Sequence, residues 1–190
     1  IITVNKPLPQ ILEKGSLGMY LQAHCWQRVV GLHIKQNKIP DYDVGHHVSW
    51  GSLRLGSGFS ASSKPYIFGP CGVSSPLKRT RIWLKNAYWK EKIRDFVGNK
   101  IFISLRFTRD SAMRAQFVLV ANESTKNLAL KLNAKKVIKF LPEGVDSTRI
   151  TIPNYREVRD PLIIWVGRFL PIKGANLAIE TFRRVLDEIP

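Results

Sequence analysis

Two basic residues near the end of the chain lie just before a predicted helix N-terminus, where an anion could bind. Arg168 and Lys173 lie in the segment GRFLPIKG, which runs from Gly167 to Gly174. An apolar run, 162–166, precedes this segment, and a sequence with amphipathic helical periodicity follows it. Two permanent cations beside the free N–H groups of a helix N-terminus can neutralise a di-anion such as a pyrophosphate. The alternative is an ordinary strand–loop–helix connection whose Arg and Lys are merely exposed.

The glycine spacing of this segment differs from that of two common nucleotide-binding motifs. GRFLPIKG matches neither the GxGxxG pattern of a dinucleotide site nor the GxxxxGK pattern of a P-loop. Hydride transfer and ATP hydrolysis are therefore disfavoured.

A pair of histidines forms the second candidate site. His46 and His47 end a short predicted strand within YDVGHHVSW, residues 42–50. Loops at strand ends hold the ligands of α/β sheets, and imidazole donates or accepts a proton near neutral pH. Adjacent side chains of a strand point to opposite faces, so at most one imidazole faces a given cleft. Packing or surface placement is the alternative for each ring.

The charge of the chain is strongly positive. Its formal net charge is +16, and residues 78–114 contribute eleven Lys or Arg against three Asp or Glu. Such a surface attracts polyanions, namely nucleic acid, anionic lipid headgroups or a nucleotide substrate, unless it is simply a solvated basic face. Cys25 and Cys71 are too few and too irregularly spaced for a disulfide framework or a zinc site, so we expect two buried thiols in a reducing compartment.

Strand and helix patterns alternate along the chain, which is typical of a parallel, doubly wound α/β sheet. The residues between 52 and 63 are expected to be loop or short helical turns, and 101–107 is compatible with either strand or helix. The main predicted strands are 42–50, 64–69, 116–121 and 136–141. The main predicted helices are 19–38 and 123–132.

A further strand and helix are predicted at the end of the chain. The run 162–166 is apolar without alternation, which predicts a parallel strand buried on both faces. Because one strand and one helix cannot form a sheet alone, we expect the chain to be a fragment cut at both ends. The predicted organisation is a partial domain at 1–147, a linker at 148–160, and the start of a second domain at 161–190.

Five motifs in succession resemble the family-4 glycosyltransferases of GT-B fold. They are YDVGHHVSWGSLR, KPYIFGPCG, AQFVLVANESTKNLALKL, KFLPEGVD and IIWVGRFLPIKGANLAIETF. The resemblance extends from about residue 42 to the end and is most specific where VGR…KG follows the PxGVD turn.

The resemblance implies a fold of two Rossmann-like domains facing one cleft, the first for the acceptor and the second for the sugar nucleotide. It implies sugar transfer with retention of anomeric configuration, and neither a metal nor a cofactor. On this template Arg168 and Lys173 bind the donor diphosphate, flanked by Gly167 and Gly174. His46 or His47 lies near the reacting sugar and is the catalytic candidate.

The resemblance also assigns cleft loops. Gly69 and Gly72 let the backbone approach the cleft, and Glu143 and Gly144 belong to a turn after a strand. Glu143 stands where the family usually has Asn, and Val73 stands where relatives carry a further Gly. Because most of a donor domain is missing from this sequence, we expect the chain alone to be inactive.

The sequence is thus interpreted as part of a cytoplasmic hexosyltransferase. Its expected partners are a nucleotide-sugar donor and a glycan, polysaccharide or lipid-linked acceptor, and residues 78–114 could dock on the anionic inner face of a membrane. The alternative is a basic nucleic-acid-binding α/β module without catalysis. Against it, no RNA-recognition or helix-turn-helix pattern is interleaved with the basic residues.

Overall fold

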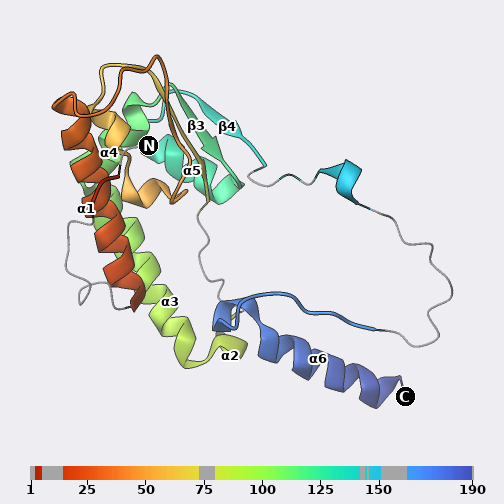
Figure 1. The fold of residues 1–190 in the computed structure, drawn as a ribbon. Helices are drawn as coiled ribbons and strands as arrows, with labels where there is room; N and C mark the ends of the chain where they lie inside the picture. The colour runs from red at the N-terminus through yellow and green to blue at the C-terminus, as the bar shows by residue number, and fades with distance from the viewer. Residues whose placement is uncertain are drawn as a thin grey trace. The chain divides into compact units, whose positions relative to one another are not determined.

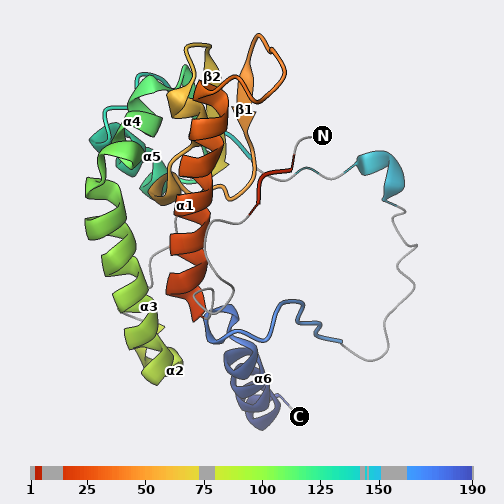
Figure 2. The same cartoon turned by 60° about the vertical axis from the view of Figure 1, so that its left-hand side comes forward.

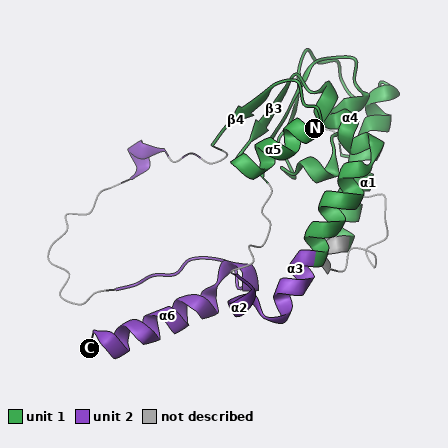
Figure 3. Ribbon diagram, turned by 180° about the vertical axis from the view of Figure 1, so that it is seen from behind, with its two compact units in different colours: residues 1–75, 93–143 green, residues 76–92, 144–190 purple. Residues whose placement is uncertain are grey.

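A computed structural model describes residues 3–5, 15–72, 80–141, 144, 146–150 and 162–189. The chain divides into two compact units, which are coloured separately in Figure 3. The first unit comprises Ile1–Ser75 and Ile93–Glu143, and the second comprises Pro76–Lys92 and Gly144–Pro190. The domain boundaries given above remain predictions.

The first unit is built on a sheet of four parallel strands (Figures 1 and 2). The strands are β1 (Gly45–His47), β2 (Tyr66–Cys71), β3 (Phe117–Val120) and β4 (Val137–Lys139). Their order in the sheet is β1-β2-β3-β4, and every neighbouring pair is parallel. The predicted parallel α/β sheet is therefore confirmed, although the described strands follow one another in sequence order without the reversal that marks a switch point.

Helical segments connect these strands. The predicted helices at 19–38 and 123–132 are confirmed, with shifted ends, and the ambiguous segment 101–107 is mostly helical. Between residues 52 and 63, where loop or short helical turns were expected, the structure has two short 3-10 helices. The helical elements of this unit are α1 (Gly15–Lys35), η2 (Leu53–Leu55), η3 (Gly58–Ala61), α3 (Asn86–Phe96, which begins in the second unit), the π-helix η5 (Val97–Phe102), α4 (Arg106–Arg114) and α5 (Glu123–Lys131).

The two faces of the sheet differ in burial. Phe68, Val118 and Val120 are fully buried on one face and form the core with Leu53. Alternate residues of the same strands, such as Ile67, lie on the other face and are only partly buried. This alternation indicates that the described core of the unit covers one face of the sheet.

A buried ion pair joins the segment after β1 to helix α3. Arg54 in η2 is only 3% exposed, and its Nη2 lies 2.5 Å from a carboxylate oxygen of Asp95. Its Nε donates to Oδ1 of Asn99 at 3.1 Å. Gly98 makes room for this side chain, because a Cβ there would lie 2.7 Å from Cδ of Arg54. The arginine therefore holds η2 against α3 and η5 through charge-assisted hydrogen bonds.

The second unit contains short helical elements and one longer helix. They are α2 (Arg81–Leu84), the first part of α3, η6 (Ser147–Arg149), η7 (Pro171–Lys173) and α6 (Ala175–Glu188). The helix predicted after Gly174 is thus confirmed. The strand predicted at 162–166 is wrong: this segment pairs with no strand, and its four aliphatic residues are 69–89% exposed. An apolar run forms a buried strand only beside other strands, and the described part of this unit provides none.

We predict that Arg54→Met lowers the free energy of unfolding by about 3 kcal/mol, because Asp95 would keep its charge in a largely buried position. Arg106→Met is the matched control, since Arg106 makes an exposed ion pair with Asp110 at 3.7 Å. We expect the control to unfold as the wild type does. Chemical denaturation followed by circular dichroism measures both, and equal losses in the two variants would contradict the role given to the buried pair.

Candidate functional site

The two histidines of the predicted site lie at the carboxyl end of β1, with their side chains on opposite faces of the sheet. Parallel pairing places His46 beside Ile67 and His47 beside Phe68 of β2. His46 is exposed, and its Nε2 donates to the carbonyl oxygen of Gly69 at 2.9 Å. His47 is buried. The expectation that the two rings face opposite sides of the sheet is therefore confirmed.

His47 is held between a serine and an aromatic ring. Its Nδ1 lies 3.0 Å from Oγ of Ser57, and its ring centroid lies 4.8 Å from that of Phe68. The other ring nitrogen, Nε2, has no hydrogen-bond partner that the structure describes. Burial lowers the pKa of His47 from 6.5 to about 4, with the Ser49 backbone opposing and His46 adding to the shift. The ring is consequently a neutral imidazole at physiological pH.

The chain segment 46–49, at the carboxyl end of β1, forms part of the wall of a pocket of about 280 Å³. Apolar side chains from helix α1 and from η3 form much of its wall, namely Trp26, Val30 and Phe59, and Ser49 adds a hydroxyl group. Trp26 is itself fixed, because its Nε1 donates to the carbonyl oxygen of Val4 at 3.1 Å. A small, mostly apolar pocket with a few polar groups is suited to a small polar ligand.

The predicted cleft glycines at the end of β2 behave differently from each other. Gly69 has φ of 126°, and a Cβ there would lie 2.3 Å from the carbonyl oxygen of Leu119. Its lack of a side chain is thus required for β2 to pack against β3. Gly72 has room for a Cβ, and its N–H donates to the carbonyl oxygen of Gly51 at 2.8 Å. Neither contact involves a ligand, so their role beside a cleft stays a prediction.

The predicted diphosphate residues lie in the second unit. Arg168 and Lys173 are both exposed, and a turn joins them through Leu170, whose N–H donates to the Arg168 carbonyl at 2.6 Å and whose carbonyl accepts from the Lys173 N–H at 2.8 Å. Trp165 closes the same turn by donating from Nε1 to the carbonyl oxygen of Lys173 at 3.3 Å.

Gly174 marks the start of α6 with φ of 70°, a left-handed conformation that glycine adopts freely. The helix therefore begins at Ala175, directly after Gly174, as the sequence predicts. Gly167 packs near the indole of Trp165, since a Cβ there would lie 3.0 Å from the ring.

The turn at 142–146 is only partly described. Glu143 lies outside the described residues, and Gly144 is exposed with nothing within 4 Å of a Cβ built on it. The assignment of both residues to a cleft loop stays a prediction.

Sequence reasoning did not find the residues that contact the His47 ring or line the pocket beside it. Ser57, Phe68 and Trp26 come from three separate segments, and their only signals were an ordinary loop serine and two core-type aromatic residues. Both cysteines are free; Cys71 is buried, as expected, whereas Cys25 is only partly buried. Burial raises the pKa of the Cys71 thiol to about 12. That thiol is thus not a nucleophile at neutral pH.

Comparisons with known proteins add no relatives. No family model matches the chain, and no curated protein or solved structure is significantly similar to it. Among the described residues, no group of three His, Cys, Asp or Glu side chains is placed to hold a metal ion. No helix in the described part of the chain has the length and apolarity to span a bilayer.

We predict that His47 makes the stability of the first unit depend on pH. Its folded pKa of about 4 is below the ordinary value of 6.5, so the unfolded chain takes up the proton first as the pH falls. The free energy of unfolding should therefore fall between about pH 6.5 and pH 4, by up to about 3 kcal/mol from this residue.

His47→Gln should remove that part of the pH dependence. His24 remains in the variant, and its pKa is also lowered by burial, so the difference between the two proteins isolates His47. Urea denaturation at a series of pH values measures the effect. Identical slopes in wild type and variant would show that His47 titrates normally in the folded chain.

Proposed function

We propose that the chain forms part of a retaining, nucleotide-sugar-dependent glycosyltransferase, with the His47 pocket on the acceptor-domain side. The observation that carries the proposal is a neutral, buried imidazole with an unpartnered Nε2, placed at the carboxyl end of a parallel strand. Ligands of α/β sheets bind outside this edge. The reaction class is inferred from the resemblance of the five successive motifs described above.

A neutral imidazole suits hydrogen bonding to a sugar better than permanent charge does. Nε2 of His47 is buried, so a sugar hydroxyl reaches it only when the side chains around it move aside; it then donates or accepts according to which nitrogen carries the proton. The contact of Nδ1 with Ser57 fixes the ring orientation, and the ring of Phe68 packs beside it at a tilt of 60°. In this proposal His47 positions a sugar hydroxyl, and His46 lies on the opposite side of the strand as a surface residue of the same loop.

The second unit would supply the charge that a departing diphosphate requires. Arg168 and Lys173 flank the turn before α6, a helix of 14 residues with no side-chain cap at its N-terminus. The uncapped N–H groups and the two cations together favour a bound di-anion. In a transferase that uses no metal, this charge would stabilise the leaving group as its bond to the sugar breaks.

We predict that the chain binds nucleoside diphosphates, and that replacing both Arg168 and Lys173 by Ala weakens this binding by at least about tenfold, because each loses a charge-assisted hydrogen bond. Isothermal titration calorimetry with UDP, GDP and ADP gives the affinities. The matched control is the double variant Arg183→Ala and Arg184→Ala, which removes the same charge from the body of α6.

We expect the control to bind as the wild type does. Absence of binding to all three nucleotides, or equal weakening in the two double variants, would contradict the donor-site assignment. Generic RNA serves as a further comparison: binding that tracks only total charge and disappears with salt would favour the nucleic-acid alternative.

A further inference from the structure

A larger pocket lies at the amino ends of the strands, whereas His47 lies at the carboxyl end of β1. It has a volume of about 440 Å³ and is formed by the segments that lead into β1 and β2. These segments contribute Asp41 and Tyr42 before β1, and Ser62 and Lys64 before β2. The amino ends of parallel strands share one edge, so this pocket is separate from the candidate site at the carboxyl ends.

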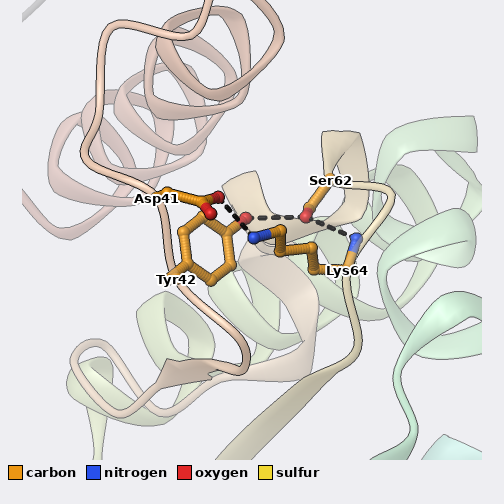
Figure 4. Close-up of polar contacts among 4 residues, drawn as sticks. All are labelled: Asp41, Tyr42, Ser62 and Lys64. Carbon is orange, nitrogen blue, oxygen red and sulfur yellow. Dashed lines mark hydrogen bonds and ion pairs between the residues drawn. The ribbon is translucent and has the colours of Figure 1, made fainter.

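A network of polar contacts organises one wall of this pocket (Figure 4). The ammonium group of Lys64 pairs with the carboxylate of Asp41 and lies 5.3 Å from the centroid of the Tyr42 ring. The Tyr42 hydroxyl donates to Oγ of Ser62 at 2.6 Å, and the backbone N–H of Lys64 donates to the same oxygen at 2.9 Å. The hydrogen bonds to Ser62 therefore link the two segments before any ligand binds, and Asp41 adds an exposed ion pair.

This network presents hydrogen-bonding groups with little uncompensated charge. Because Ser62 Oγ accepts two hydrogen bonds, its own proton remains to be donated, and the Tyr42 oxygen keeps its capacity to accept. Asp41 offsets the charge of Lys64, and the amide of Asn37 adds another donor and acceptor. A ring of hydroxyl groups, as in a sugar, matches this mixture of donors and acceptors.

A second cavity adjoins the first and has a different character. It encloses about 260 Å³ and shares Lys35 and Ala61 with the larger pocket. Arg28, Lys35 and Arg114 line it, with Asp110 as an opposing carboxylate. The guanidinium of Arg114 is anchored by donating to the Ser62 carbonyl at 3.4 Å. Guanidinium groups bind carboxylates and phosphates through paired hydrogen bonds, so this cavity is suited to an anion.

We propose that these two adjoining cavities bind an acidic oligosaccharide, with a sugar ring in the Tyr42 pocket and an anionic group in the cavity beside Arg28 and Arg114. A neutral glycan would leave the cations unmatched, and a small anion would leave the hydroxyl and carboxylate groups of the first pocket unused. Only the identification of this glycan as an acceptor chain rests on the proposed transferase function. Glycan binding at this site can therefore be tested, and can fail, independently of nucleotide binding.

The probe for this site is trigalacturonate, with the neutral galactotriose and the non-sugar tri-anion tricarballylate as comparisons. Calorimetry on the 190-residue chain at physiological salt should show trigalacturonate binding at least about tenfold more tightly than either comparison, because each of them lacks one half of the recognition. Equal binding of tricarballylate would mean that the site recognises its ligand by charge alone. Equal or tighter binding of oligouridylate would assign the site to RNA instead.

Point variants locate the binding. Tyr42→Phe removes one hydroxyl group, and Arg28→Ala removes one cation; each should weaken trigalacturonate binding several-fold. Arg109→Ala is the matched control, since Arg109 is exposed on α4 and lines neither cavity. Thermal unfolding verifies that each variant is folded. Absence of trigalacturonate binding, or losses in the control equal to those in Arg28→Ala, would overturn the proposal.

Discussion

The candidate site depends on the register between β1 and β2. Pairing His47 with Phe68 places the imidazole in the core and leaves His46 at the surface. A shift by one residue would exchange the two rings, because successive side chains of a strand point to opposite faces. The contacts around His47 reinforce this register, since Ser57 holds Nδ1 and Arg54 fixes the preceding η2 turn against α3 through a buried ion pair. Strand pairing and side-chain contacts thus act together to keep one neutral imidazole at the strand end.

Much of the first unit follows from local patterns in the sequence. The alternation of apolar strands with helical segments predicts the parallel sheet, and turn residues place the strand ends to within a few positions. The separation of His46 from His47 also follows from strand geometry alone. The π-helix was not predicted, and the segment of the two 3-10 helices was left open between loop and short helical turns, because their form depends on tertiary contacts such as the fit of Arg54 beside Gly98.

The segment 162–166 shows that a local sequence pattern does not reveal whether strand partners are present. Its residues have strand propensity and no polar interruption, yet a parallel strand exists only with partners, and the described part of the second unit provides none. The pockets were equally beyond prediction. Trp26, His47 and Phe59 are far apart in sequence and meet through the packing of α1 and η3 against the sheet. The Tyr42 network likewise joins two loops whose residues look ordinary when read separately.

The central claim is that the edge of the sheet at His47 binds a sugar nucleotide or its sugar. NMR spectra of the chain labelled uniformly with 15N and 13C, recorded while UDP-, GDP- and ADP-sugars are added, test it most directly. The account predicts that at least one donor shifts the side-chain resonances of His47, together with backbone signals at the carboxyl ends of β1 and β2. Signals of Asp41 and Lys64, at the opposite edge, should remain unchanged. Shifts confined to that opposite edge, or none at His47 with any donor, would contradict it.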